Sequence, residues 1–400
     1  MPLHDPAHAF MPYPDVAVPC ASTGPLSGLS VGVKDLFDVA GYPTSGGQPF
    51  ILAMSGIKAS TAPTVQVLLD AGARFAGKTI TDELAYSMNG QNAHFGSPLN
   101  GAAPERISGG SSSGSASAVS HRLCDFALGT DTGGSVRAPA NHCGLIGLRP
   151  THGRVSLHGA LDLSPSFDTC GWFARDVSTF ARVADVLLGQ DAQPLPAAVR
   201  LLAPGEVWGL LDAEVLAALA PARARIENAL GTARALDVVL DSFEAMFSNF
   251  RTLQAREAWD THATLIQRFA PPLGSVVAQR MAWAKAVSDE QVVQAQMFRQ
   301  RFRAVLRELL GSDGVLVMPT MPDIAPLIST EESSLDAYRN RAGQMLCIAG
   351  LSGFPQLTLP LATRLGAPLG ISLLGPPGSD RSLVRLAEQI SQQTLQPPPA

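Results

Sequence analysis

Two loops rich in glycine and serine lie close together in this chain and constrain its fold more than any other feature. They span residues 109–115 (GGSSSGS) and 131–137 (DTGGSVR). Residues without a Cβ allow tight turns and let the backbone approach other groups closely. Upstream, residues 29–35 (LSVGVKD) alternate apolar side chains and predict a strand that ends in a lysine. A base, a proton relay and a nucleophile can be built from these three segments.

Ser135 is the best candidate nucleophile among the serines. A serine hydroxyl reacts slowly at neutral pH, so it needs a base within hydrogen-bond reach and donors where an oxyanion will form. The glycines at 133 and 134 let consecutive N–H groups turn inward. We therefore expect an oxyanion hole made of the backbone N–H groups of Thr132, Gly133, Gly134 and Ser135.

These segments, in this order and followed by residues 141–151 (NHCGLIGLRPT), resemble the amidase signature family. The resemblance implies a Ser-cisSer-Lys triad of Ser135, Ser111 and Lys34, with a cis peptide bond between Gly110 and Ser111. Ser111 would pass the proton of Ser135 to a neutral Lys34. Burial of this lysine among apolar neighbours would lower its pKa enough for that role. Ser113 stands where many members of the family have glycine.

Three other motifs do not match. The first loop lacks the Gly-Lys-Ser/Thr ending of a P-loop and the Gly-x-Gly-x-x-Gly pattern of dinucleotide-binding folds. Ser135 is not surrounded by the Gly-x-Ser-x-Gly motif of a nucleophile elbow. An α/β-hydrolase triad is therefore not expected.

The fold class implied by the resemblance is α/β, with a mixed central β-sheet flanked by helices on both faces. Residues 64–73 and 115–122 predict helices, and residues 74–78 and 315–320 predict strands. Helical periodicity dominates residues 211–310. We expect one domain over 1–400, with a core at 24–190 and 311–395 and a helical cap at about 200–310.

Composition narrows the range of partners. The net charge is −5 and no run of basic residues is present, so no nucleic-acid surface is expected. Five scattered cysteines and eight histidines without ligand spacing predict neither disulfides nor a metal site. No cofactor and no membrane segment are expected. The N-terminal residues lack the pattern of a signal peptide, so we expect a cytoplasmic protein and leave a homodimer open.

We therefore expect an amidase that hydrolyses a small aryl or arylalkyl amide through a seryl acyl-enzyme, most similar to short indole-3-acetamide-type amidases. Tyr86, Met88 and Gly110 are expected near the substrate. Few charges flank the serine loops, so we expect a pocket that prefers a neutral aromatic acyl group over a charged one. Asp131 is expected to support the loop by pairing with Arg137, although Arg137 could instead bind a substrate carboxylate. The alternatives are an ammonia-supplying amidase subunit of a transamidosome, a hydrolase of ureas or carbamates, and a binding module without catalysis.

Overall fold

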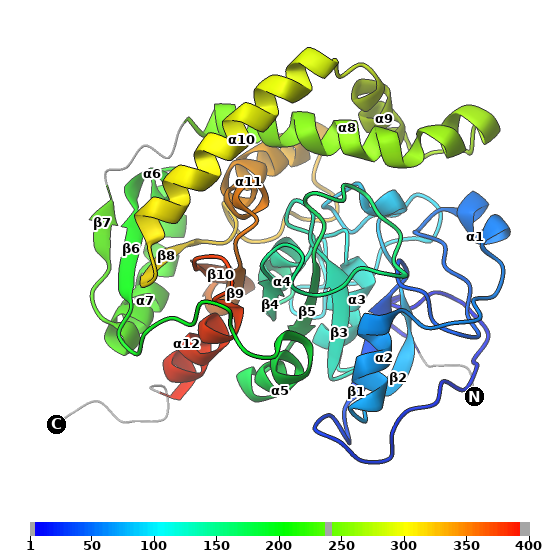
Figure 1. Cartoon of the computed structure of the whole chain (residues 1–400), viewed down its shortest axis with the longest axis horizontal. Helices are drawn as coiled ribbons and strands as arrows, with labels where there is room; N and C mark the ends of the chain where they lie inside the picture. Colours follow the sequence, from blue (N-terminus) through cyan, green and yellow to red (C-terminus); the bar gives the residue numbers. More distant parts are fainter. Residues whose placement is uncertain (1–4, 237–241, 393–400) are drawn as a thin grey trace.

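The computed structural model describes residues 5–236 and 242–392, and a ten-stranded sheet runs through its centre (Figure 1). The strand order is β2-β1-β3-β5-β4-β9-β10-β8-β6-β7. The strands are β1 Ser30–Lys34, β2 Arg74–Thr79, β3 Phe126–Thr130, β4 Ile146–Arg149, β5 Cys170–Ala174, β6 Arg200–Pro204, β7 Arg234–Leu236, β8 Gly314–Pro319, β9 Gln356–Arg364 and β10 Ala367–Leu374.

The sheet is mixed, which confirms the expected class. β1 pairs in parallel with β2 and β3, and β6 pairs in parallel with β7 and β8. Between these two groups, β3, β5, β4, β9, β10 and β8 pair antiparallel in that order. Every residue of β1, β3, β4 and β5 is buried, as is typical of strands covered on both faces.

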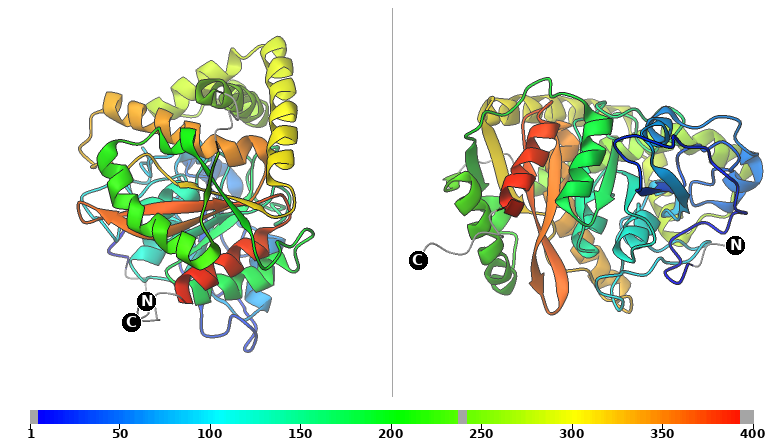
Figure 2. Two further views of the ribbon diagram at one scale, coloured as in Figure 1. Left: turned by 90° about the vertical axis from the view of Figure 1, so that its left-hand side faces the viewer. Right: turned by 90° about the horizontal axis from the view of Figure 1, so that it is seen from below.

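Helices cover both faces of the sheet. In Figure 2, α7 and α12 lie on one side of the strands, and α10 and α11 lie on the other. The helices are α1 Pro49–Ser55, α2 Pro63–Asp70, η1 Glu83–Ala85, α3 Ser113–Ser120, α4 Arg137–His142, α5 Val177–Leu188, α6 Gly205–Trp208, α7 Ala213–Leu230, α8 Phe243–Phe269, α9 Ser275–Lys285, α10 Asp289–Leu310, α11 Glu332–Ser352 and α12 Asp380–Gln392.

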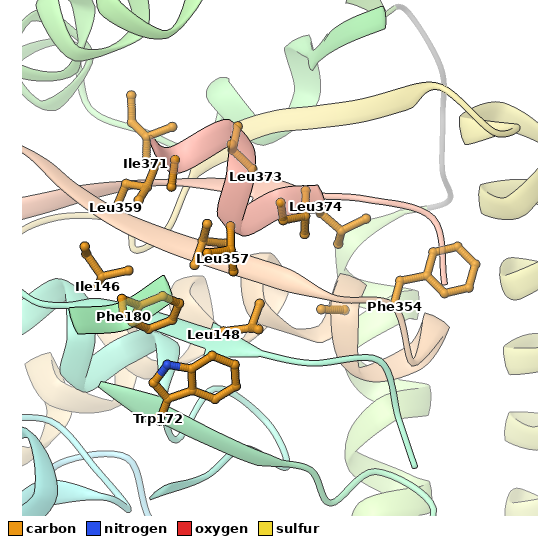
Figure 3. Close-up of a cluster of buried hydrophobic side chains, with 14 of the residues drawn as sticks. Ile146, Leu148, Trp172, Phe180, Phe354, Leu357, Leu359, Ile371, Leu373 and Leu374 are labelled. Carbon is orange, nitrogen blue, oxygen red and sulfur yellow. The ribbon is translucent and has the colours of Figure 1, made fainter. Parts of the chain in front are cut away.

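The central strands and the helices next to them share one large apolar core. Trp172 on β5 stacks on Phe180 of α5, with ring centroids 4.9 Å apart. Figure 3 shows this pair beside side chains of β4, β9 and β10, all of them fully or almost fully buried. This core includes β3, the strand that leads into the loop at residues 131–137.

The expected cap boundary at about residue 200 is wrong. β6 and β7 extend the central sheet, and α7 packs against α12, β9 and β10, so this part belongs to the core. The helices that stand apart from the sheet are α8, α9 and most of α10, at the top of Figure 1. Residues 237–241, at the junction, lie outside the described part. Within the described residues, no helix is both long and apolar enough to span a bilayer.

Candidate active site

Lys34 is the last residue of β1 and its side chain is completely buried. Its Nζ lies 2.8 Å from Ser111 Oγ, 3.0 Å from Ser112 Oγ and 2.8 Å from Thr130 Oγ1. Burial disfavours the ammonium form and lowers the pKa of Lys34 to about 7, against the opposing effect of the charges on Asp82, Asp131 and Asp168. A substantial fraction of this lysine is therefore neutral near neutral pH.

The carboxylate next to Lys34 in sequence does not pair with it. Asp35 instead forms a fully buried ion pair with Lys78 of β2, with Oδ1 and Nζ 2.6 Å apart. The other carboxylate oxygen accepts hydrogen bonds from the Tyr13 hydroxyl and the Ser45 N–H. No carboxylate of the described residues forms an ion pair with Lys34. Because the charge of Lys78 balances that of Asp35, this aspartate does not stabilise the protonated form of Lys34.

The geometry distinguishes the two serines that contact Lys34. The Gly110–Ser111 peptide bond is cis, as the resemblance implies. The Ser112 hydroxyl donates to the Thr130 carbonyl at 3.2 Å and accepts from the Thr130 N–H at 3.2 Å. Within the described residues, the Ser111 hydroxyl bonds to Lys34 alone. Ser111 is therefore the hydroxyl that is free to exchange its proton with the amine.

Asp131 organises the loop that carries Ser135. Its carboxylate accepts from the N–H groups of Gly134, Val136 and Arg137 at 2.9, 3.1 and 3.2 Å. It also pairs with the guanidinium groups of Arg137 and Arg149 at 2.8 and 3.1 Å. These contacts hold the pKa of Asp131 well below its usual range despite burial. The loop is thus fixed around a buried carboxylate that stays charged.

One expectation about this loop needs correction. The Gly134 N–H donates to Asp131, so Gly134 is removed from the expected oxyanion donors. In the described structure, the N–H groups of Thr132, Gly133 and Ser135 form no hydrogen bond. Gly134 is needed for another reason: its φ is +127°, and a Cβ there would lie 2.5 Å from the Leu346 side chain.

Arg137 is not among the residues that line the cavity next to Ser135. It is fully buried, and its Nε and Nη2 donate to Asp131 while its Nη1 donates to the Leu346 carbonyl and to Gln356. All three guanidinium nitrogens are therefore engaged within the protein. The expected pairing of Arg137 with Asp131 is observed, and the alternative, recognition of a substrate carboxylate by Arg137, is wrong for this geometry.

A cavity of about 450 Å³ is lined by residues 85–88, by Gly133 and Ser135 of the second serine loop, and by residues of helices α8, α9 and α11. Ser135 and Gly133 line it, together with the expected Tyr86 and Met88. Gly110 is not among the lining residues, because it packs against Asp82 and its N–H donates to the Met88 carbonyl at 2.9 Å. The Ser135 hydroxyl makes no hydrogen bond within the described residues. The Ser112 N–H donates to the Ser135 carbonyl at 3.4 Å and links the two loops.

The cavity carries more charge than the sequence around the loops predicts. Its lining includes four aromatic side chains, three arginines and two carboxylates, namely Tyr86, Phe247, Phe250, Trp283, Arg251, Arg280, Arg339, Glu332 and Asp336. The expected preference for a neutral acyl group rested on the few charges around the serine loops, and the cavity lining does not share that composition. All of these except Tyr86 come from α8, α9 and α11, distant in sequence from the loops. Thr130, the third partner of Lys34, was also not anticipated.

Comparisons with known proteins identify the family of this chain. The family model described as Amidase matches residues 15–207 and 208–384. Amidase 1 of Arabidopsis thaliana is 37% identical over 96% of this chain and 97% of its own length. Outer envelope protein 64, chloroplastic, of the same plant is 33% identical over 94% of this chain and 68% of its own length. A structure titled "Crystal structure of amidase" superposes with a TM-score of 0.81 at 30% identity, covering 92% of this chain and 85% of that one.

Proposed function

This chain belongs to the amidase signature family and is a hydrolase of amide C–N bonds, and from that premise we propose that it cleaves a small aryl or arylalkyl amide through an acyl-enzyme on Ser135. The observation that carries the proposal is the buried Lys34, whose amine contacts three hydroxyl groups and forms no ion pair with any residue that the structure describes. Such an amine can accept a proton, whereas a solvated lysine at neutral pH cannot.

The proposed reaction starts with attack of Ser135 Oγ on the amide carbonyl carbon. The Ser135 proton moves to Ser111 Oγ while the Ser111 proton moves to Lys34 Nζ. The N–H groups of Thr132, Gly133 and Ser135 stabilise the oxyanion. Protonated Lys34 then returns a proton through Ser111 to the leaving nitrogen, the C–N bond breaks and ammonia or an amine departs. Water attacks the acyl-enzyme by the same relay and releases the carboxylate.

The aromatic lining of the cavity supports an aryl or arylalkyl acyl group. Phe250 packs edge-on against Phe167 at 5.0 Å between ring centroids, so its ring is held in place beside Gly133. Tyr86, Phe247 and Trp283 complete the apolar surface. Aromatic rings bind another ring by burial and by favourable edge or offset contacts. A substrate of the indole-3-acetamide type is the finer form of this proposal.

Phenylacetamide is expected to be hydrolysed with a kcat/KM about 100-fold above that of acetamide, because burying one ring is worth roughly 2–3 kcal/mol. Trp283→Ala should reduce the ratio of kcat/KM for phenylacetamide to kcat/KM for acetamide. The matched control is Phe269→Ala, since Phe269 is 40% exposed, like Trp283 at 41%, but lies outside the cavity. Ammonia release measured by a coupled assay gives the ratios. Equal efficiency for both amides would contradict the aryl assignment.

The pH dependence of kcat/KM should report the Lys34 relay. Only the neutral amine accepts the proton, and burial lowers the pKa of Lys34 to about 7. Activity should therefore rise about tenfold per pH unit below that pKa and level off above it, with the observed pKa belonging to the coupled Lys34–Ser111–Ser135 set. Initial rates at low phenylacetamide concentration give this profile. A rise that begins only near the pKa of a free lysine, about 10.4, would argue against the relay.

The alternatives differ in what the isolated chain does. An ammonia-supplying subunit would need a partner for full activity, and a hydrolase of ureas or carbamates would favour phenylurea or a benzyl carbamate over phenylacetamide. A binding module would hydrolyse none of them, and the arrangement of Lys34 and Ser111 argues against it. We also propose a cytoplasmic location. It is a proposal and not a finding, because one relative is named as a chloroplastic envelope protein.

A further inference from the structure

The charges in the cavity do not balance. Arg339 pairs with both cavity carboxylates, at 2.6 Å from Glu332 and in closer contact with Asp336. Among the described residues, Arg251 and Arg280 form no ion pair, although both line the same cavity as Ser135. Two guanidinium groups thus line the cavity without an ion-pair partner from the part of the chain that the structure describes.

The two arginines are held by aromatic rings rather than by acidic groups. Arg251 of α8 lies over Trp283 at 5.0 Å and over Phe247 at 5.5 Å, measured from Cζ to the ring centroid. Arg280 of α9 lies over Tyr86 at 5.5 Å, and its Nη1 donates to the Tyr86 carbonyl at 2.6 Å. A guanidinium that contacts a ring through its face keeps in-plane N–H groups for a carboxylate.

The electrostatics of the pair also favour an anion. Burial is the main cause that lowers the pKa of Arg280, and the positive charges of Arg339 and Arg251 lower it further. The negative charge of the buried Asp82 raises the pKa of Arg280, and a phenolate on Tyr86 would do the same. Like charges in a partly desolvated cavity raise the free energy of the empty site. An anion between them would relieve this repulsion.

We propose that Arg251 and Arg280 bind a carboxylate on the acyl part of the substrate, so that the enzyme prefers aryl amides that carry a carboxylate away from the amide to be cleaved. This inference rests on the proposed function, because it places the amide at Ser135 of the same cavity. The aromatic side chains of the cavity hold the ring of the substrate between its amide, at Ser135, and its carboxylate, at the two arginines. Arg137 takes no part, since its nitrogens are engaged elsewhere.

Binding to a Ser135→Ala variant tests this inference without turnover. The probes are 4-(carboxymethyl)phenylacetamide and its methyl ester, which differ in charge but share the ring and the amide. The acid is expected to bind about 10-fold to 100-fold more tightly by calorimetry, the range of a charge-assisted hydrogen bond. Raising the ionic strength should reduce this preference, because Arg251 is exposed to solvent.

Arg251→Met in the Ser135→Ala background should reduce the preference for the acid, measured as the ratio of the two dissociation constants, severalfold, because only Arg280 remains to bind the carboxylate. The unbranched methionine side chain still covers Phe247 and Trp283. The matched control is Arg256→Met on the same helix, whose guanidinium pairs with Asp260 and Asp289 outside the cavity. It should leave the ratio unchanged. Equal affinity for acid and ester, or a ratio that Arg251→Met does not alter, would overturn the carboxylate site. Absence of phenylacetamide hydrolysis by the wild-type enzyme would instead overturn the proposed function.

Discussion

Replacing Lys34 by alanine is expected to lower kcat/KM for phenylacetamide by at least about 10³-fold, because the proposed relay loses its base. In the described structure the Ser111 hydroxyl forms a hydrogen bond only with the Lys34 amine, so no other side chain is placed to take its proton. Residual hydrolysis would come from the oxyanion donors and substrate binding. The measurement is steady-state kinetics at a pH above 8, where the wild-type lysine is neutral.

Two further variants distinguish the loss of the catalytic base from the loss of the folded structure. Lys34→Met fills most of the volume of the buried side chain, so it should be as inactive as Lys34→Ala while unfolding closer to the wild-type temperature. Lys58→Ala removes a partly exposed lysine that pairs with Asp38 at 3.4 Å, and it should change kcat/KM by less than about twofold. Substantial activity in a folded Lys34→Met enzyme would rule out the relay.

Ser135→Ala is expected to have an effect on the order of 10⁴-fold or more on kcat, because the acyl-enzyme can no longer form. Affinity for phenylacetamide should stay within a few-fold of the wild-type value, since the ring contacts and the remaining N–H donors are unchanged. Single-turnover kinetics and calorimetry separate these two quantities. A Ser135→Ala variant that turns over at a tenth of the wild-type rate would mean that another group attacks the amide.

The parts of the site that were predicted from sequence are those encoded by local patterns. The Gly-Ser loops, the strand ending at Lys34 and the buried strand at residues 314–319 have strong local signals, and the structure has elements at each place. The resemblance supplied the triad of Ser135, Ser111 and Lys34 and the cis bond before Ser111. These features depend on backbone conformation over a few residues, which glycine placement and apolar alternation indicate well.

The features that were not predicted depend on contacts between distant segments. Whether the Gly134 N–H points to an oxyanion or to Asp131 depends on the side-chain position of Asp131, which a motif does not specify. Arg251 and Arg280 reach the cavity only because α8 and α9 pack above the serine loops. β6 lies just before the stretch dominated by helical periodicity and the three-residue β7 lies within it, so the pattern placed the cap boundary too early.

The most direct test of the central claim is to identify the residue that becomes covalently modified. The enzyme is treated with a fluorophosphonate, digested, and mapped by peptide mass spectrometry, with Lys34→Met treated in parallel. The account predicts one adduct on Ser135 in the wild-type enzyme and much slower labelling in the variant, because the proton of Ser135 can no longer reach Lys34 through Ser111. An adduct on Ser111 or Ser112 with Ser135 unmodified would contradict the assignment of the nucleophile.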